Sequence, residues 1–344
     1  MKLDRLAVNS IQGIALLLVI FACFADFLAP NPPNRQDLRN FYAPPTRIHF
    51  VDTSGKVHLR PFVYRYELTD PLEGSYKERT ETAFPLEFFV KDWRYDLLGF
   101  IPASRHLVRS RGGDLYLLGT DGLGRDVAAR TIGGTRTSLV VMLLGISLYA
   151  IVGTAIGAAA GLSGGWRDAW LMRFAEFVLA LPALYIILAL RALLPLKLPY
   201  WQTVLVSVGT ISLIAWPALS RGVRGLILQL RSSGYVEAAR SLGGTSGQIF
   251  ARHMLPALAP YILTQTALAA PVFVLGEILL SFLGLGFDEG GESWGSMLRS
   301  MTDLRVLTDF WWNLAPLFLV FAALLCLNVL SHRYRTREID QITL

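Results

Sequence analysis

Six apolar runs dominate the sequence, and each is long enough to cross a lipid bilayer as a helix. A membrane-spanning helix needs about 20 mostly apolar residues. Hydrophobic side chains make up 53% of the 344 residues and charged ones only 17%, a balance that a soluble domain rarely shows. The sequence therefore predicts an all-α membrane protein with six transmembrane helices. The expected spans are Ala7 to Leu28, Ser138 to Leu162, Ala169 to Leu194, Trp201 to Leu219, Leu258 to Leu285 and Trp312 to Leu330.

Basic residues gather in alternate short loops between these runs, and this pattern predicts the orientation. Six spans place both termini on the same side. Cytoplasmic loops carry an excess of Lys and Arg, so we expect cytoplasmic termini and a cytoplasmic tail of residues 333–344. The net charge of +6 is then a topology signal rather than a nucleic-acid surface. The basic residues concerned are Lys2, Arg5, Arg167, Arg173, those from Arg221 to Arg252, Arg333, Arg335 and Arg337.

A polar stretch, residues 30–117, separates the first span within residues 1–29 from the others. Two alternating segments, Ile48 to Val51 and Val57 to Val63, flank a turn-forming sequence and predict a β-hairpin. Phe84 to Val90 is a further strand candidate. We expect a small β-rich insertion on the external side of the membrane.

The basic segment 232–256, between the fourth and fifth spans, predicts two short helices that form an elbow. Neighbouring alanines favour the first helix, and Gly243 is a natural terminator. Ser246 can cap a second helix that runs to a break at Pro256. The alanines make a narrow surface, flanked by charge, that another protein can approach closely. This geometry suits docking, and an ordinary interfacial helix and turn is the alternative.

The residue order in this segment resembles the EAA loop of ABC importer permeases. Glu237-Ala238-Ala239 is followed by Gly243 and then by Leu255-Pro256, at the spacing of that family. In the family this loop is a coupling helix, which inserts into a groove of the nucleotide-binding subunit. The resemblance therefore implies that coupling to an ATPase rests on Glu237, Ala238, Ala239, Arg240, Gly243, Leu255 and Pro256.

Further motifs resemble the C-type subunits of dipeptide and oligopeptide importers. They are Leu118-Gly-Thr-Asp-Gly-Leu-Gly-Arg-Asp-Val127 and Ser281-Phe-Leu-Gly-Leu-Gly286, followed by Ser293-Trp-Gly295. The resemblance implies a type I ABC importer permease fold with a five-helix core over residues 118–332. The insertion looks like the external loop of the permease in microcin C and peptide uptake systems, which implies a periplasmic position. The terminal residues 331–337 depart from the tail usual in the family.

The resemblance also implies a set of partners. A sister permease would complete the pathway as a heterodimer, and a periplasmic solute-binding protein would deliver the substrate. Two ATP-binding subunits, or one fused ATPase, would carry ATP and Mg²⁺, so that this inner-membrane chain binds no cofactor or metal. The sequence itself contains no GxxxxGK[ST], HExxH or GxSxG motif, which argues against an enzyme. Peptides are the expected substrate, with oligosaccharides and metal chelates as alternatives.

Two groups of polar or bend-forming residues are candidates for other roles. A carboxylate inside an apolar span is costly unless it faces a partner or a cavity, which makes Glu277 a pathway candidate. A charged turn before the second span is either an anion site or a structure that satisfies its own backbone, and we favour the second interpretation. The pathway or gating candidates are Glu277, Ser281, Pro271 and Gly276. The turn candidates are Thr120, Asp121, Gly124, Arg125 and Asp126.

Two rival functions fit part of the sequence. A secondary transporter would need several buried ionisable residues for ion coupling, whereas the spans contain essentially Glu277 alone. A membrane scaffold or receptor that presents residues 30–117 would leave the EAA-like loop unexplained. Both cysteines, Cys23 and Cys326, lie in apolar runs and are expected to pack as small apolar side chains.

Overall fold

The computed structural model describes residues 2–70, 74–97, 100–195, 198–287 and 291–342, with side chains described between residues 13 and 331 except at Arg191. Helices account for 63% of the structure. The chain divides into two compact units. Unit 1 comprises Met1–Leu139 and Ser281–Ala323, and unit 2 comprises Val140–Leu280 and Leu324–Leu344.

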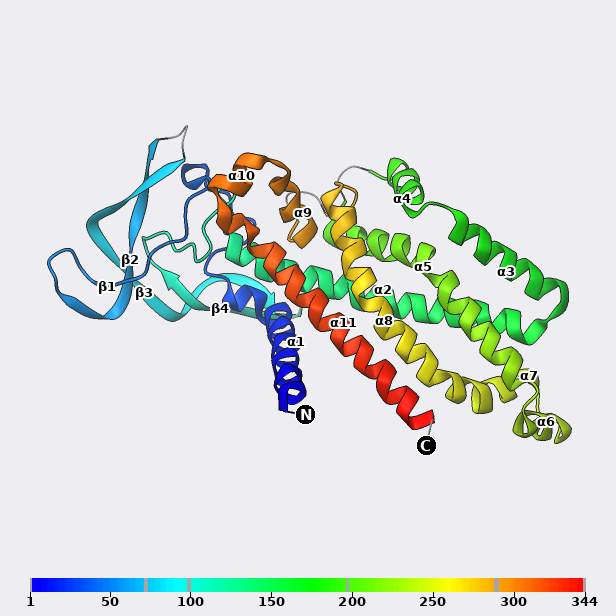
Figure 1. Ribbon diagram of the computed structural model, residues 1–344. Coiled ribbons are helices and arrows are strands. Elements are labelled where there is room, and N and C mark those ends of the chain that lie inside the picture. The colour runs from blue at the N-terminus through cyan, green and yellow to red at the C-terminus, as the bar shows by residue number, and fades with distance from the viewer. Residues whose placement is uncertain (1, 71–73, 98–99, 196–197, 288–290, 343–344) are drawn as a thin grey trace. The chain divides into compact units, whose positions relative to one another are not determined.

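Unit 1 contains an antiparallel sheet of four strands in the order β1-β2-β3-β4 (Figure 1). β1 pairs with β2, so the predicted hairpin is present. Its turn closes because the Asp52 carboxylate accepts hydrogen bonds from the backbone N–H groups of Ser54 (2.9 Å) and Lys56 (3.0 Å). The third predicted strand is the middle of a much longer one. The strands are β1 (His49–Val51), β2 (Val57–Asp70), β3 (Ser75–Leu97) and β4 (Ile101–Ser110).

The rest of unit 1 consists of α1 and of short helical segments packed around an aromatic cluster. Val127, Met297, Phe310 and Trp312 are buried together. Tyr42 stacks on Phe310 with 4.2 Å between ring centroids. The elements are α1 (Lys2–Leu28), a 3₁₀ turn η1 (Leu38–Asn40), α9 (Trp294–Arg299), η3 (Ser300–Thr302), α10 (Leu304–Asp309) and η4 (Trp311–Leu314).

Unit 2 is built from long helices, and three glycines bring α2 and α5 into close contact. A Cβ added at Gly157 would lie 2.5 Å from the carbonyl oxygen of Ser220. At Gly153 and Gly161 it would lie 2.8 Å from side-chain atoms of α5. Glycines four residues apart permit such contacts between membrane helices. The long helices that lie wholly or mostly in unit 2 are α2 (Val127–Ser163), α3 (Gly165–Ala180), α4 (Ala183–Ala192), α5 (Tyr200–Leu230), α8 (Leu255–Phe282) and α11 (Ala315–Ile342).

The structure supports some of the six predicted membrane spans and corrects one of them. Four described helices are long and apolar enough to cross a bilayer, and a fifth span results if α3 and α4 are counted together. Ala169 to Leu194 is wrong as one straight span, because α3 and α4 meet at 88°. Leu181 is extended there (ψ 128°), since Pro182 disfavours a helical residue before it. The described apolar part of α1, Gly13–Leu28, is shorter than the four, and the count of six stays a prediction.

Two predicted spans lie within longer helices. α2 begins at Val127, well before the predicted Ser138, and α5 continues beyond Leu219. The extensions contain charged residues whose partners come from other elements. On α5, the Arg224 guanidinium donates two hydrogen bonds to the Asp168 carboxylate, at 2.5 and 2.6 Å. The helices can therefore extend past the apolar runs without leaving these charges unpaired.

We expect Gly157→Ala to lower the free energy of unfolding by about 1–3 kcal/mol, because the new methyl group meets backbone atoms that cannot rotate away. Thermal unfolding of the detergent-solubilised chain measures the effect. Gly225→Ala is the matched control on α5, since a Cβ there has no atom within 4 Å. Equal effects of the two variants would contradict the close contact of α2 with α5.

Candidate functional site

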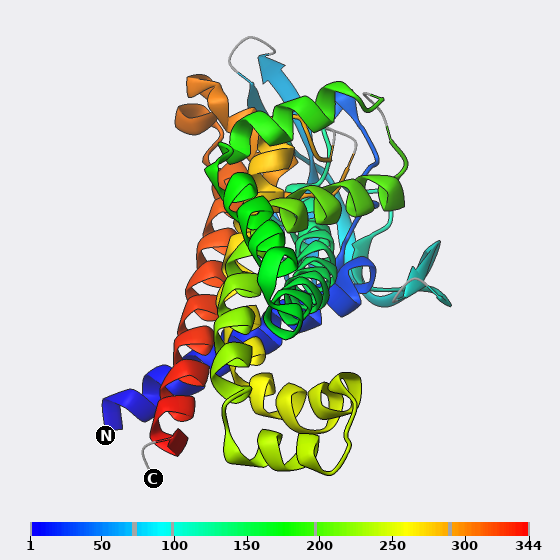
Figure 2. The same ribbon diagram turned by 90° about the vertical axis from the view of Figure 1, so that its right-hand side faces the viewer.

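The segment between α5 and α8 forms an elbow of two short helices (Figure 2). The first, α6 (Gly234–Ser241), ends in a pair of hydrogen bonds. The Gly243 N–H donates to the Arg240 carbonyl (3.0 Å), and the Gly244 N–H donates to the Ala239 carbonyl (3.1 Å). Gly243 has a φ of +84°, which a residue with a Cβ rarely adopts. The predicted stop at Gly243 is confirmed.

The second helix of the elbow, α7 (Ser246–Ile249), starts with a different cap from the one predicted. The Thr245 hydroxyl accepts a hydrogen bond from the Gln248 backbone N–H (3.4 Å). The Gln248 side chain accepts one in return from the Thr245 N–H (3.1 Å). The prediction of Ser246 as the cap was wrong by one residue, because only Thr245 has a Gln three positions later to complete a capping box.

The predicted break at Pro256 was also wrong. A π-helical turn, η2 (Phe250–Met254), leads directly into α8. The Leu255 N–H donates to the Phe250 carbonyl five residues earlier. This wider turn accommodates a proline, whose ring would clash with the carbonyl four residues before it in a regular α-helix. The elbow is therefore joined to α8 by continuous helix.

One face of α6 carries an apolar stripe. Tyr235, Ala238, Ala239 and Leu242 are spaced so that they share this face. Tyr235 is 47% exposed and Leu242 is 89% exposed. Val236, which lies outside this stripe, is fully buried. Val236 thus anchors the helix, while Tyr235 and Leu242 stay exposed.

Of the seven predicted coupling residues, the structure places five in the elbow and two at the start of α8. Glu237 and Arg240 are exposed on the side of α6 opposite the stripe. Leu255 and Pro256 are exposed in the first turn of α8. Their assignment to coupling stays a prediction.

The predicted pathway residues lie on α8. Glu277 is fully buried and has an interaction partner. A Cβ at Gly276 would lie 3.1 Å from Ile211 on α5, so this glycine serves close helix packing. Pro271 is buried within the helix, which continues through it. The Ser281 hydroxyl accepts a hydrogen bond from the Phe287 N–H (3.1 Å) and thereby secures the turn after α8.

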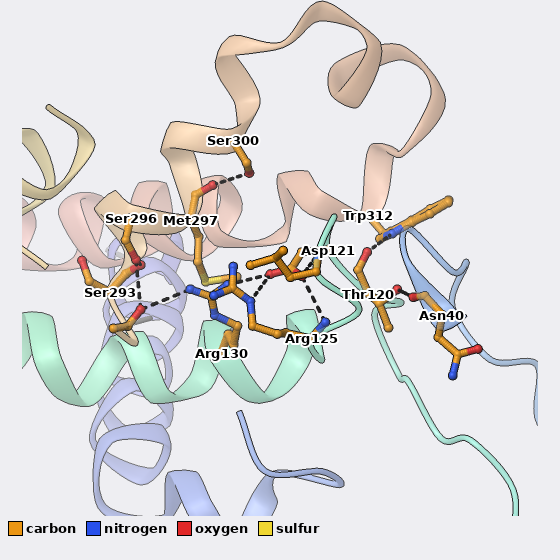
Figure 3. Close-up of polar contacts among 12 residues, drawn as sticks. Asn40, Thr120, Asp121, Arg125, Arg130, Ser293, Ser296, Met297, Ser300 and Trp312 are labelled. Carbon is orange, nitrogen blue, oxygen red and sulfur yellow. Dashed lines mark hydrogen bonds and ion pairs between the residues drawn. The ribbon is translucent and has the colours of Figure 1, made fainter. Parts of the chain in front are cut away.

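The predicted turn of residues 120–126, in unit 1, is held together by the Asp121 carboxylate (Figure 3). One of its oxygens accepts hydrogen bonds from the backbone N–H groups of Leu123 (2.9 Å) and Arg125 (3.0 Å). The other accepts from the guanidinium groups of Arg125 (2.8 Å) and Arg130 (2.6 Å). The turn therefore satisfies its own polar groups, in line with the structural interpretation.

Thr120 and Asp126 secure the two ends of this turn. The Trp312 indole N–H donates to the Thr120 carbonyl (3.0 Å). The Asp126 carboxylate caps α2 by accepting from the Ala129 N–H (3.1 Å), and it also accepts from the Asn31 side chain (2.9 Å). Burial raises the pKa of Asp126 to about 6.

A cavity of about 260 Å³ lies beside the turn. Gly124, within the turn, has a φ of +67°, and a Cβ there would collide with the Asp37 carbonyl oxygen. Only glycine fits this position. The cavity is lined by Tyr42, Asp121, Gly122, Leu123, Arg125, Arg130, Ser296, Met297, Ser300 and Asn313.

Sequence reasoning gave no structural role to three residues near the start of α2, although Trp294 belongs to the Ser293-Trp-Gly295 motif. Arg130 also donates to the Gly291 carbonyl (3.1 Å). Trp294 is fully buried, and its indole N–H donates to the Thr131 carbonyl (3.0 Å). Burial, followed by the nearby Asp26 charge, raises the pKa of Glu292 to about 7. The sequence signal for these residues was their position as polar or aromatic residues beside apolar runs. It could not reveal their contacts, because the contacting residues are distant in sequence.

Comparison with known proteins bears on the elbow and the membrane helices. The sequence model of the family described as "Binding-protein-dependent transport system inner membrane component" matches residues 153–336, which include the whole elbow. The chain belongs to this family. A second family model, described as "N-terminal TM domain of oligopeptide transport permease C", matches residues 4–45. α1 of this permease therefore matches a transmembrane region.

Three relatives show how far the similarity of this permease extends. A putative peptide permease protein of Brucella suis is 37% identical over 221 residues, which are 64% of this chain and 71% of that protein. The oligopeptide transport system permease protein OppC of Haemophilus influenzae is 34% identical over 73% of this chain and 76% of its own length. The glutathione transport system permease protein GsiD of Pectobacterium atrosepticum is 31% identical over 70% of this chain and 74% of its own length.

These findings confirm the resemblance to C-type permeases of ABC importers. The permease is an inner-membrane protein, and members of its family work with ATPase and solute-binding partners. The narrower resemblance to microcin C systems stays a prediction.

We expect Gly243→Ala to loosen the end of α6, because alanine at this φ costs about 1–2 kcal/mol. The rate of proteolytic cleavage in residues 232–246 should rise roughly five- to thirty-fold, since cleavage follows the population of the opened state. Gly247→Ala is the matched control, as neither glycine has an atom within 4 Å of an added Cβ and only Gly243 has a positive φ. Unchanged cleavage of the Gly243 variant would refute the role of the cap.

Glu292 should make the stability of unit 1 depend on pH. Its folded pKa of about 7 lies above the ordinary 4.5, so the folded state binds the proton more tightly than the unfolded state. The contribution of Glu292 to the free energy of unfolding therefore falls as pH rises from about 4.5 to about 7, by on the order of 1–3 kcal/mol. We expect Glu292→Gln to remove this part of the pH dependence in thermal unfolding. Glu81→Gln, at a side chain 75% exposed, should leave it unchanged.

Proposed function

We propose that this chain is one of two permease subunits of an ATP-binding-cassette importer that takes up peptides across the bacterial inner membrane. The observation that carries the proposal is the exposed apolar stripe on α6, in the EAA-like segment of a chain that belongs to this transport family. The chain acts mechanically and is not itself an enzyme. ATP and Mg²⁺ are bound by separate ATPase subunits, and a sister permease completes the pathway.

The stripe on α6 is the surface that docks on the ATPase. Burial of a large apolar side chain such as Leu242 stabilises a contact by about 1.5–3 kcal/mol. Glu237 and Arg240, on the other side of α6, supply charge for orientation. Residues 246–282 run as one long helical segment from α7 into α8. Movement of α7 is therefore passed to α8 through continuous helix, and α6 is joined to α7 by the short turn at Gly243 and Gly244.

The orientation follows from this docking. The elbow and both termini lie in the cytoplasm, and residues 30–117 lie in the periplasm, where a solute-binding protein delivers the substrate. Glu277, Ser281, Pro271 and Gly276 lie on the helix that the elbow moves. A secondary transporter is the less favoured alternative, supported by the burial of Glu277 alone.

Peptides are the proposed substrate because relatives carry the names of peptide, oligopeptide and glutathione permeases. Microcin C-like peptides are a narrower possibility within this class. Oligosaccharides and metal chelates are the alternatives. Uptake of radiolabelled peptides and oligosaccharides by the reconstituted transporter distinguishes them, and ATP-dependent uptake of the sugars alone would overturn the peptide assignment.

Leu242→Asp tests the docking surface. We expect it to weaken association with the co-expressed ATPase by about ten- to a hundred-fold, because it removes an apolar contact and adds a charge at its centre. The side chain is 89% exposed, so folding should be unaffected. Copurification and ATPase activity of the membrane complex measure the effect.

Ser246→Asp is the control for the added charge, since Ser246 is exposed on α7 and lies outside the stripe. It should copurify like the unmodified chain. Retention of the ATPase and of coupled uptake by the Leu242 variant would rule out the docking role. Absence of any ATPase in the purified complex would reopen the scaffold or receptor reading.

A further inference from the structure

The β3–β4 hairpin exposes large apolar side chains that the rest of unit 1 does not cover. Phe88 and Phe89 on β3 are 56% and 63% exposed. Phe100, which precedes β4, is 73% exposed, and Ile101 at its start is 44% exposed. Figure 2 shows the two strands reaching outward past the end of α1. Phe88 and Phe89 lie at the base of the hairpin, and Phe100 and Ile101 lie at its tip, beside Leu97 on β3. Exposed apolar side chains of this kind usually mark a contact with another molecule or with lipid.

The base of the hairpin is fixed to the C-terminal end of α1. The rings of Phe89 and Phe27 have centroids 6.1 Å apart. The buried His106 ring on β4 hydrogen-bonds through Nδ1 to the Asp26 carbonyl (2.9 Å). The Asp26 carboxylate is paired with Arg136 on α2 (2.7 Å). Since α1 is the transmembrane helix of the N-terminal region, these contacts hold the hairpin where that helix leaves the bilayer.

α1 itself is apolar on the faces that the structure leaves uncovered. Leu16, Val19 and Ile20 are between 40% and 62% exposed, and Phe24 is 44% exposed one turn before Phe27. Phe24 and Phe27 contact each other edge to face, with centroids 6.5 Å apart. The exposed apolar surface therefore continues from the lipid-facing side of α1 through Phe27 to Phe89 at the base of the hairpin.

The other side chains of the hairpin are those found at membrane interfaces. Trp93 and Tyr95 pack with the His106 ring, at 4.2 and 5.1 Å between centroids. Aromatic residues with a polar edge concentrate at the level of lipid headgroups. Phe89 has a φ of +55°, a strained conformation for a residue with a Cβ, which keeps two consecutive phenylalanines exposed.

Three basic and two acidic side chains are exposed on the described part of residues 86–110. Lys91, Arg94 and Arg105 are exposed on its two strands. Among the acidic residues of the same stretch, Asp92 is paired with Arg109, and Asp96 is exposed. Basic residues beside an apolar cluster favour anionic lipid headgroups over neutral ones.

We propose that the β3–β4 hairpin is a lipid anchor, which lies on the bilayer surface beside the end of α1. Phe88, Phe89, Phe100 and Ile101 enter the boundary between headgroups and acyl chains. Lys91, Arg94 and Arg105 bind the phosphate groups of anionic lipids. A lipid surface is favoured over a protein partner because the apolar surface is continuous with the lipid-facing side of α1. The anchor would hold the insertion at a fixed level on the membrane.

The test uses a fluorescent probe in the assembled, reconstituted transporter. Phe100→Cys is labelled with an environment-sensitive dye in a chain whose native cysteines are replaced by serine. Vesicles contain lipids with a quencher on the upper acyl chain, and phosphatidylglycerol is present or absent. Leu59→Cys is the matched control, because Leu59 lies on β2 of the same sheet and is fully exposed. Basal ATPase activity confirms that each variant is assembled.

We expect quenching of the probe at position 100 and little quenching at position 59. The Arg94→Gln and Arg105→Gln changes should each lower the ratio of lipid-bound to free hairpin about five-fold in vesicles with phosphatidylglycerol, and have little effect without it. Equal quenching at the two positions would overturn the proposal. So would a probe at position 100 that is shielded only when the sister permease or the solute-binding protein is present, since the contact would then be with protein.

Discussion

Every polar group in or beside a membrane-spanning helix must find its partner within the protein, because the hydrocarbon of a bilayer offers none. Among the described residues, three carboxylates meet that requirement by pairing with arginines. Asp121 binds two arginines at the start of α2, Asp26 at the end of α1 binds Arg136, and Asp168 on α3 binds Arg224 on α5. Asp121 and Arg130 are almost wholly buried, so removal of either would leave a charge shielded from water, which costs more than the pair contributes.

The elbow between α5 and α8 differs from these regions because its most distinctive side chains are left exposed. Its ends are fixed by backbone hydrogen bonds, by a reciprocal cap at Thr245 and by a π-turn, all of which are local. A surface that is rigid before it binds loses less entropy on binding than a flexible one. The same rigidity suits a part that must transmit movement to α8. The function proposed for the chain thus depends on a small, well-capped segment rather than on any catalytic group.

The sequence was most informative where structure depends on local patterns. Apolar runs located the helices, alternation located the first hairpin, and Gly243 located the end of α6. It failed where distant partners or backbone adjustments decide the outcome. Arg224 lies 56 positions from Asp168, so nothing local predicted that α5 would extend through it. Pro256 was expected to break a helix, and a π-turn accommodates it. The glycines at 153, 157 and 161 were readable from their spacing, but only the structure identifies α5 as the helix they approach.

The central claim is that α6 docks on an ATPase and moves with it. Hydrogen exchange of the backbone amides of residues 234–242, measured in the free chain and in the assembled complex, tests this most directly. The account predicts slower exchange throughout α6 when the ATPase is bound, and a further change when ATP is added. Exchange in α6 that is the same with and without the ATPase would contradict it, even if the complex remained intact.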